Sequence, residues 1–414
     1  MSKDKKTRDR KTRHKERDLA DNEFEKTVKE IQQQYGDATI HLARNVPQPA
    51  RIPTNVFILD FCLLGGIPHN RVTTIVGERH AGKSMIADMI TASAQRMYPD
   101  GVACKVDVEG THDTVWSEKL GVDVDRQYVA TPETGESAVD MTEGLIRSKE
   151  TSIVVVDSIA ALVPMKEVES SAEDQQMGEQ ARLVGKMVRK VTTALIEERK
   201  RDHEVTLILL NQFRTKIGVM YGDPRTSPGG KALEFCATVH AIMKNKEKFG
   251  KDEFDIETVE ENDHAFQITK NKMNAGPRTG EFRLRRIPNE EYGLSEGTVD
   301  DAETLLAYAK KFGHYTGGGS AWTLEFWNFK RTFKGAHEWC IYLYQHPTVY
   351  WMLRNFLIWT QAKRLGMPDY FLESFIDDQD KDAKEAEDVD AEATEEAEEE
   401  VNEAPSQRRR RTRS

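Results

Sequence analysis

Hydrophobic residues gather in short runs between about residues 71 and 286, and amphipathic stretches of helical periodicity separate these runs. The runs predict strands over Val72–Val76, Val102–Val106, Ile153–Val156, Thr206–Leu210, Val239–Met243 and Phe266–Thr269. Most of the first four runs are almost uninterrupted, which is typical of parallel strands buried on both faces. Strands that alternate with helices predict an α/β domain with a mainly parallel central sheet.

Two smaller regions flank this core. Near the N-terminus, apolar residues recur at helical spacing before Gly36, namely Phe24, Val28, Ile31 and Tyr35. They predict a helical module within residues 18–50, which leaves 51–295 for the core. Beyond Gly297 the chain is rich in Trp, Phe and Tyr, which predicts a small α+β domain over 296–376.

The net charge of −11 is unevenly distributed over the 414 residues. Residues 1–17 carry a net charge of +6, residues 377–403 carry −13, and Arg408–Arg413 contains five arginines. Blocks of like charge predict solvated, disordered tails over 1–17 and 377–414. Such tails either keep the protein soluble or regulate it, and composition does not separate these two roles.

Composition also excludes several classes of protein. No run reaches the ~18 apolar residues of a membrane span, and the basic N-terminus lacks the apolar segment of a secretory signal. The cysteines, Cys62, Cys104, Cys236 and Cys340, form no C-x-x-C pair, which argues against a zinc site or a disulfide framework. We therefore expect a soluble cytoplasmic protein without a membrane partner.

A phosphate-binding motif follows the first predicted core strand. The pattern G-x-x-x-x-G-K-S comprises Gly77, Glu78, Arg79, His80, Ala81, Gly82, Lys83 and Ser84, and a helix is predicted to begin near its end. Glycines let backbone N–H groups point at phosphate oxygens, and the helix N-terminus adds a positive end. Lys83 would reach the β- and γ-phosphates, and the Ser84 hydroxyl would bind Mg²⁺. The motif therefore predicts binding of a nucleotide with Mg²⁺.

Acidic residues end two of the predicted strands. Asp157 follows Ile153–Val156 at the strand end where α/β sheets bind ligands, so it is a candidate Mg²⁺ ligand; otherwise it is an ordinary turn residue. Asp107 and Glu109 follow Val102–Val106. Glu109 is the candidate general base for the attacking water, and Asp107 competes for this role.

A loop of nearly twenty residues follows Thr206–Leu210, which is unusual in a compact domain. It combines glycines, cations and apolar side chains, among them Arg214, Lys216, Ile217, Gly218, Met220, Tyr221, Arg225, Gly229, Gly230 and Lys231. Cations suit the phosphates of single-stranded nucleic acid, and apolar groups suit its unstacked bases. The alternative is a surface lid over the nucleotide.

A helix with two distinct faces is predicted from Met177 onward. Its apolar stripe contains Met177, Ala181, Val184, Val188, Val191 and Leu195, which predicts a buried face. Arg182, Lys186 and Arg189 form a basic stripe on another face. This stripe either contacts nucleic-acid phosphates or is simply a solvated surface.

Together these residues resemble the bacterial RecA family of recombinases, from about residue 22 to about residue 316. The most specific parts are Val155-Val-Asp157-Ser158-Ile-Ala-Ala161-Leu, Met177-Gly178 with Arg182, the run from Asn211-Gln212 through Pro224 to Gly229-Gly230, and Lys270-Asn271-Lys272. The resemblance implies a RecA-type P-loop ATPase core. It also implies a filament on single-stranded DNA that pairs with homologous duplex and exchanges strands in recombination and repair.

The resemblance also implies roles for individual residues. Glu109 is the catalytic carboxylate, Gln212 senses the γ-phosphate, and Lys270 and Lys272 reach the ATP of the neighbouring subunit. Asp113 and Trp116 contact adenine. The two DNA-binding loops cover about 164–178 and 213–230, and residues 22–50 dock on the adjacent subunit.

The chain departs from the family pattern in places that leave rival functions open. The residues between Gly77 and Gly82 are unusually large, the metal hydroxyl is Ser rather than Thr, and Arg286 stands where the family has a tyrosine near adenine. The large loop residues motivate a non-catalytic filament protein that only binds ATP. A helicase on the same core fold is the other alternative, and Gly229-Gly230 with the lysine pair favours recombination.

Overall fold

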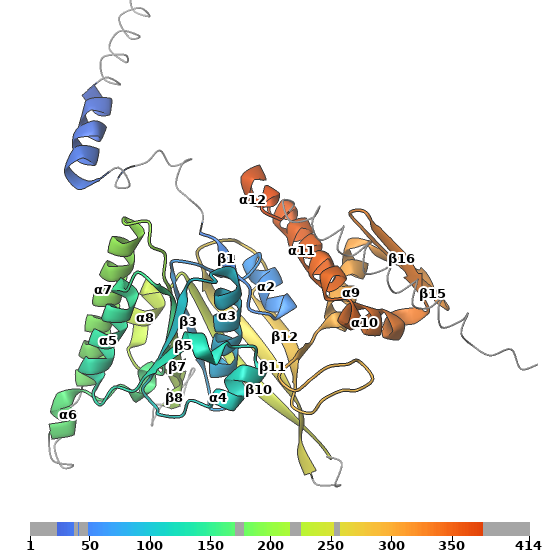
Figure 1. Cartoon of the computed structure of the whole chain (residues 1–414), viewed down its shortest axis with the longest axis horizontal. Coiled ribbons are helices and arrows are strands. Elements are labelled where there is room, and N and C mark those ends of the chain that lie inside the picture. Colours follow the sequence, from blue (N-terminus) through green and yellow to red (C-terminus); the bar gives the residue numbers. More distant parts are fainter. Residues whose placement is uncertain are drawn as a thin grey trace, which may run out of the picture.

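A computed structural model of the chain describes residues 23–36, 40, 49–169, 178–215, 225–251 and 257–375 (Figure 1). The expected tails over 1–17 and 377–414 lie outside these residues. Within them, no helix is long and apolar enough to cross a membrane. The resemblance assigned 22–50 to a docking module, and the structure describes a helix over 23–35 with Phe24 and Tyr35 exposed.

A nine-stranded sheet forms the centre of the molecule, in the order β13-β12-β11-β10-β3-β7-β6-β4-β5. Six neighbouring strands are parallel: β10 (Val239–Lys251), β3 (Val72–Gly77), β7 (Thr206–Gln212), β6 (Thr151–Asp157), β4 (Val102–Asp107) and β5 (Gln127–Ala130). The expectation of a mainly parallel sheet is confirmed.

The other part of the sheet is antiparallel. Here β10 pairs with β11 (Glu257–Asn271), β11 with β12 (Thr279–Arg285), and β12 with β13 (Val299–Asp300). The strands β10 and β11 extend well beyond the apolar runs of the sequence. Since β13 belongs to this sheet, the expected domain boundary at residue 296 falls before its last strand.

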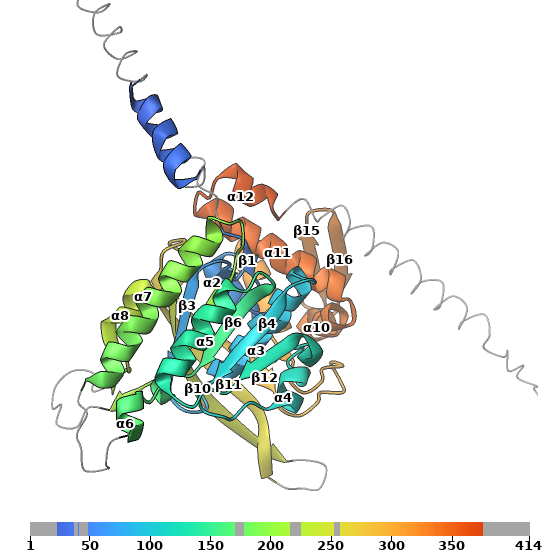
Figure 2. The same ribbon diagram turned by 60° about the vertical axis from the view of Figure 1, so that its left-hand side comes forward.

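Helices cover both faces of the parallel strands, and alternate strand residues supply the two cores. Ile153 and Val155 pack in the core that includes α3 (Lys83–Met97) and α2 (Phe57–Leu63). Val154 and Val156 pack in the core that includes α5 (Gly135–Arg147) and α7 (Glu179–Arg199). Figure 2 shows α5 and α7 side by side. The inner parallel strands β3, β7, β6 and β4 are therefore buried on both faces, as their continuous apolar runs predict, whereas the edge strand β5 is partly exposed.

The buried face of α7 corrects one detail of the expected stripe. Val184, Val191 and Leu195 are buried as predicted, but Ala181 is exposed. The residues of α7 that pack in the core begin only at Leu183, one turn into the helix. Met177 lies outside the described residues. Arg182, Lys186 and Arg189 are exposed, as the basic stripe requires.

The short elements around the sheet include α4 (Thr114–Lys119), α6 (Met165–Glu169) and α8 (Gly230–Cys236). Two ribbons pair β1 (Arg51–Ile52) with β2 (Ile67–Pro68) and β8 (Arg214–Thr215) with β9 (Arg225–Thr226). Single 3₁₀ turns lie at Val124–Arg126 and Ile159–Ala161.

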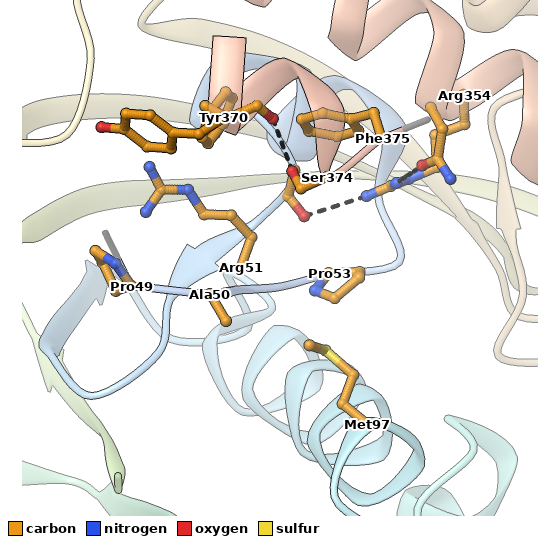
Figure 3. A pocket seen from close by; sticks show the side chains of 12 residues that line it. Pro49, Ala50, Arg51, Pro53, Met97, Arg354, Tyr370, Ser374 and Phe375 are labelled. Carbon is orange, nitrogen blue, oxygen red and sulfur yellow. Dashed lines mark hydrogen bonds between the residues drawn. The ribbon is translucent and has the colours of Figure 1, made fainter. Parts of the chain in front are cut away.

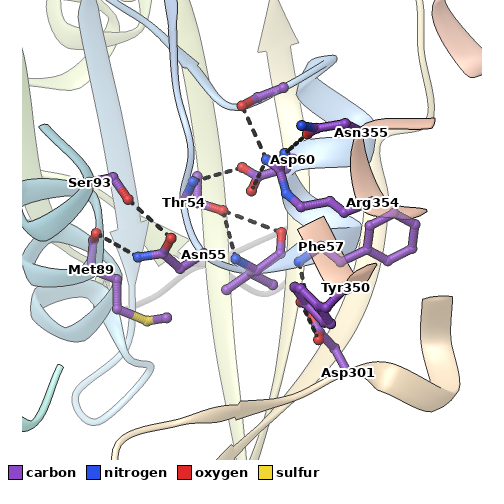
Figure 4. A network of polar contacts seen from close by, with 12 residues as sticks. Thr54, Asn55, Phe57, Asp60, Met89, Ser93, Asp301, Tyr350, Arg354 and Asn355 are labelled. Carbon is purple, nitrogen blue, oxygen red and sulfur yellow. Dashed lines mark hydrogen bonds and ion pairs between the residues drawn. The ribbon is translucent and has the colours of Figure 1, made fainter. Parts of the chain in front are cut away.

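The C-terminal region combines helices with a three-stranded sheet. It comprises α9 (Ala302–Phe312), β14 (Tyr315–Gly318), β15 (Ala321–Phe326), β16 (Phe329–Phe333), α10 (Gly335–Gln345), α11 (Pro347–Arg364) and α12 (Asp369–Glu373). The helix α11 packs on α2 of the core. Its Arg354 reaches Asp60 of α2, and its Tyr350 reaches Asp301, which caps the amide of Phe57 (Figure 4).

Candidate functional site

The phosphate loop, residues 77–84, connects the end of β3 to the start of α3. Gly82 is the N-cap with a φ of 82°, and a Cβ atom there would lie 2.8 Å from His264 Cε1. Both facts require glycine. Lys83 is buried and donates to the carbonyl of Glu78 at 2.7 Å. Burial lowers the pKa of Lys83, and the charges of Asp157 and Glu109 oppose that shift.

Strand register explains why the other candidate residues converge on this loop. Gly77 of β3 is paired with Gln212 of β7, and Asp107 of β4 is paired with Asp157 of β6. All four residues end parallel strands, so they lie along one edge of the sheet. This is the edge at which α/β sheets bind ligands.

The two proposed Mg²⁺ ligands are in contact. Ser84 Oγ donates to Asp157 Oδ2 at 2.7 Å. Burial raises the pKa of Asp157, and the nearby Lys105 charge opposes this effect. Hard oxygen donors at a helix N-terminus fit Mg²⁺, which also takes ligands from water and phosphate. Within the described ranges, no group of three or more His, Cys, Asp or Glu could hold a metal by itself.

The structure distinguishes between the two acids that follow β4. Asp107 is buried, and its two carboxylate oxygens accept hydrogen bonds from the backbone amides of Gly110 and His112 at 2.9 and 2.8 Å. Glu109 is exposed on the same turn. Because Asp107 is engaged in holding this turn, Glu109 is the acid that remains accessible to a water molecule.

Glu109 is also the point at which two other segments meet the site. Gln212 Nε2 and Ser158 Oγ both donate to Glu109 Oε1, each at 2.6 Å. Gln212 ends β7 and immediately precedes the long loop that the sequence assigned to DNA. A ligand that disturbs the contact between Gln212 and Glu109 would therefore act directly on the start of that loop.

A pocket opens beside the phosphate loop. It is lined by His80, Ala81, Gly82, Lys83, Ser84, Met85, Trp116, His264 and Arg286. The guanidinium of Arg286 lies 4.2 Å from the centre of the Trp116 ring. The expected adenine contact of Trp116 thus lies in the pocket, and Arg286 packs on the same ring. This arrangement offers flat surfaces to a base.

Four candidate nucleotide-binding residues do not line this pocket. Gly77 is buried at the strand end, and Glu78 and Arg79 are exposed. Asp113 is exposed and caps α4 by accepting a hydrogen bond from the Trp116 amide at 3.0 Å. Asp113 therefore positions the helix that carries Trp116.

The candidate DNA-binding residues are only partly described. Met177, Lys216, Ile217 and Gly218 lie outside the described residues. Gly178 and Gly229 are N-caps of α7 and α8 with φ values of 88° and 77°. Arg214 donates to the carbonyl of Ala160 at 2.8 Å.

Other members of this set lie close to α7. A Cβ atom at Gly229 would lie 2.4 Å from Val184 Cγ1, so only glycine fits where the loop returns to α7. Gly230 is the first residue of α8. Arg182 and Arg189 are exposed on α7, and Arg182 pairs with Glu179 at 3.0 Å.

The two candidate trans-acting lysines lie away from the pocket of their own chain. Lys270 is near the end of β11 and donates to the carbonyls of Glu234 and Phe235 at the end of α8. Lys272 is exposed just beyond the strand. Neither lysine lines the pocket beside the phosphate loop.

Sequence reasoning missed two residues. His264 lines the pocket, stacks on Phe282 with ring centres 5.1 Å apart, and has its pKa lowered to about 4, chiefly by burial. Lys105 is buried within β4 and lies 3.8 Å from Asp157. A lysine inside the apolar run Val102–Val106 was the available signal, and it was overlooked because the run as a whole predicts a buried strand.

A separate pocket lies between β1 and α12 (Figure 3). Its lining includes Arg51, Arg354 and the rings of Tyr370, Phe371 and Phe375. Figure 3 shows the Arg51 guanidinium beside Tyr370. None of the candidate nucleotide or DNA residues lines this pocket, so it is not part of the site.

Known proteins resemble this chain over much of its length. The RecA N-terminal domain model matches residues 22–286. Protein RecA of Symbiobacterium thermophilum is 38% identical over 286 residues, which cover 67% of this chain and 76% of that protein. Protein RecA of Roseiflexus castenholzii is 39% identical over 282 residues, which cover 67% and 74%. Protein RecA of Thermus aquaticus is 38% identical over 267 residues, which cover 63% of this chain and 75% of that protein.

Proposed function

Because the chain belongs to the RecA family and is a RecA-type, DNA-dependent ATPase of recombination, we propose how its own residues perform that activity. ATP binds with its phosphates on residues 77–84 and its base beside Trp116 and Arg286. The positive end of α3 and the buried Lys83 supply the attraction for the phosphates. The pocket lining supports this orientation.

Ser84 and Asp157 would hold Mg²⁺ together with the ATP phosphates. Bound there, the metal ion would neutralise charge on the transferred phosphoryl group. The hydrogen bond of 2.7 Å between the two side chains supports the assignment, because it brings two hard oxygen ligands together at the helix N-terminus.

Glu109 would accept the proton of the attacking water. The carboxylate is exposed beside the phosphate loop, whereas Asp107 is occupied by backbone amides. Gln212 would report the γ-phosphate to the loop behind it. The observation that carries this proposal is the 2.6 Å contact between Gln212 Nε2 and Glu109 Oε1, since it joins the hydrolytic acid to the strand that leads into the loop.

That loop, over 213–230, and the segment 164–178 would bind single-stranded DNA and homologous duplex in a filament of many subunits. The N-terminal module within 18–50 would dock on the adjacent subunit. In that filament, Lys270 and Lys272 would stabilise transition-state charge on the ATP of a neighbour. Their placement away from their own pocket supports a role in trans.

Glu109→Gln tests the proposed base. The amide keeps the size of the side chain and its contact with Gln212, but it cannot take a proton. We expect single-turnover ATP hydrolysis on single-stranded DNA to fall by about 10²–10⁴-fold, with ATP-dependent DNA binding retained. Asp107→Asn, which alters the competing acid in the same way, is the variant for comparison. Hydrolysis by Glu109→Gln at the parent rate would show that another group is the base.

Mixed filaments test the proposed lysines. Lys83→Ala removes the phosphate contact on one side of an interface, and Lys272→Ala removes a group on the other side. Mixing the two inactive proteins should form some interfaces with both groups intact, so ATPase activity should partly recover. Lys270→Ala should behave like Lys272→Ala. Absence of recovery at every mixing ratio, with filaments seen by electron microscopy, would refute action in trans.

A further inference from the structure

The buried Lys105 of β4 lies directly behind the nucleotide site. Its side chain is 4% exposed, and its Nζ lies 3.3 Å from Asp88 Oδ1 and 3.8 Å from Asp157 Oδ2. The side chains of these carboxylates are only 5% and 11% exposed. A buried ammonium is costly to desolvate unless it is paired. Lys105 is paired on two sides, and one partner is the proposed metal carboxylate.

Asp88 connects this lysine to two helices of the site. It is a residue of α3, the helix that begins with the phosphate loop. Its Oδ1 pairs with Lys105, and its Oδ2 accepts a hydrogen bond from Ser117 Oγ of α4 at 3.0 Å. Ser117 is adjacent to Trp116, which lines the pocket. Lys105, Asp88 and Ser117 therefore form a buried bridge among β4, α3 and α4.

The oxygen of Asp157 that faces Lys105 is also the oxygen that binds Ser84. Both contacts are to Oδ2, at 3.8 Å from Lys105 Nζ and 2.7 Å from Ser84 Oγ. A divalent cation between Ser84 and Asp157 would thus share its carboxylate with an ammonium group a few ångströms away. Two cations at such a separation repel each other, and the repulsion is strong where water is scarce.

We propose that Lys105 is a positioning residue that acts as a built-in countercharge of Asp157. It holds the carboxylate against Ser84 when no divalent cation is bound, and it raises the Mg²⁺ concentration that nucleotide binding requires. Asp88 moderates this effect, because it shares the ammonium with Asp157. The inference rests on the proposed metal role of Ser84 and Asp157.

The test varies the charge near Asp157 in opposite directions in the full-length protein. Lys105→Met/Asp88→Asn removes the ammonium and its partner charge together, and the Asn amide can still accept from Ser117. The readout is binding of a fluorescent, non-hydrolysable ATP analogue as Mg²⁺ is titrated. We expect the half-saturating Mg²⁺ concentration to fall by about tenfold, since a nearby repelling charge is lost.

Asp88→Asn alone should have the opposite effect. It leaves Lys105 with Asp157 as its only charged partner among the three, so the half-saturating Mg²⁺ concentration should rise severalfold. Lys105→Arg keeps the positive charge and should stay near the parent value. The matched control is Lys190→Met, which breaks pairs with Asp140 and Glu143 that join α5 to α7. It should leave the Mg²⁺ titration unchanged.

The outcomes separate this inference from the metal assignment on which it rests. If Asp157→Asn weakens the Mg²⁺ dependence while the double variant and Asp88→Asn both titrate like the parent, the countercharge is refuted and the metal site stands. If Asp157→Asn leaves the dependence unchanged, the metal assignment itself fails. A higher Mg²⁺ requirement in the double variant would also overturn the proposal. Should the double variant not fold, Asp88→Asn and Lys105→Arg decide the question.

Discussion

Two buried polar clusters among the described residues differ in how completely their carboxylates are occupied. The interdomain cluster comprises Asp60, Asp301, Tyr350 and Arg354. The site cluster comprises Asp88, Lys105 and Asp157. The first joins the core to the C-terminal region, and the second lies behind the phosphate loop.

Every carboxylate oxygen of the interdomain cluster accepts a hydrogen bond. Asp60 accepts from the Thr54 amide at 2.8 Å and from Arg354 at 2.6 Å. Asp301 accepts from the Phe57 amide at 2.9 Å and from Tyr350 at 2.6 Å (Figure 4). Both carboxylates are thus held at each oxygen, so the cluster can fix one arrangement of the two regions. Arg354 Nε is buried and has no hydrogen-bond partner among the described residues.

The site cluster leaves one of its carboxylates incompletely used. The side-chain contacts that the described residues make with Asp157 are both to Oδ2. A protein that only needed stability would satisfy this group fully or replace it with an apolar residue. The difference indicates that the interdomain cluster serves structure, whereas the site cluster retains bonding capacity for chemistry.

The same change of carboxylate to amide should therefore have opposite consequences in the two clusters. Asp60→Asn leaves the buried Arg354 without its charged partner, and we expect a loss of about 3–5 kcal/mol in the free energy of unfolding. ATP hydrolysis per folded molecule should be unchanged. Chemical denaturation and an ATPase assay on the same sample measure both quantities.

The control for Asp60→Asn replaces the whole pair. Asp60→Leu/Arg354→Met removes both charges and fills the space with apolar atoms, so most of the lost stability should return. If the double variant is as unstable as Asp60→Asn, then the loss in the free energy of unfolding comes from packing at this position and not from the unpaired charge.

In the site cluster, Asp157→Asn should affect function and not stability. Lys105 keeps its ion pair with Asp88 when Asp157 becomes a neutral amide of the same shape, so the free energy of unfolding should change by less than about 1 kcal/mol. Loss of this proposed metal ligand should lower the rate of hydrolysis by about 10²–10³-fold. A large loss of stability would show that Asp157 belongs with the structural carboxylates.

The sequence could predict those features of the structure that depend on a local pattern of residues. The four strands β3, β4, β6 and β7 begin at or close to the residues that their apolar runs indicated, because a strand buried on both faces has few polar positions to blur its limits. The hairpin of β10 and β11 runs far beyond its apolar residues. Its outer part is composed largely of charged residues, which carry no strand signal.

Other features depend on contacts that local pattern does not contain. The phosphate-loop motif and the strand ends pointed to Lys83, Ser84 and Asp157, whereas position alone left Asp107 and Glu109 open and only the resemblance favoured Glu109. The backbone turn that occupies Asp107 supports the same proposal, and it is not visible in the local sequence pattern. Lys105 was hidden because its partner Asp88 is on a different element, and nothing in either segment alone indicates a pair.

Two buried groups, His264 beside the phosphate loop and Asp301 in the interdomain cluster, should change stability in opposite directions as the pH falls. His264, in the nucleotide pocket, has its pKa lowered from 6.5 to about 4, chiefly by burial. Between these values the unfolded chain binds more protons than the folded one, so this group makes stability fall as the pH falls. From pH 7 to pH 5 the loss is about 2 kcal/mol. His264→Gln should remove that part of the acid sensitivity.

Asp301 of the interdomain cluster changes stability in the opposite direction as the pH falls. Its pKa is raised from 3.8 to about 6, chiefly by burial. Between these values the folded chain binds more protons, so this group adds about 1 kcal/mol of stability from pH 6 to pH 5. Asp301→Asn should lose this gain. Denaturation curves at pH 7, 6 and 5 test both variants against the parent, and equal pH slopes in all three proteins would contradict both assignments.

The smallest expected effect comes from two buried serines, one on each side of this comparison. Ser117 donates to Asp88 at 3.0 Å in the bridge behind the pocket, and Ser93 contacts Asn55 at 3.1 Å beside the interdomain cluster (Figure 4). Ser117→Ala and Ser93→Ala should each cost about 1 kcal/mol of stability, the usual value of one buried hydrogen bond. Only Ser117→Ala should weaken binding of the ATP analogue, because Ser117 holds the helix that carries Trp116. Equal nucleotide affinity in the two variants would mean that the bridge stabilises the fold without positioning the pocket.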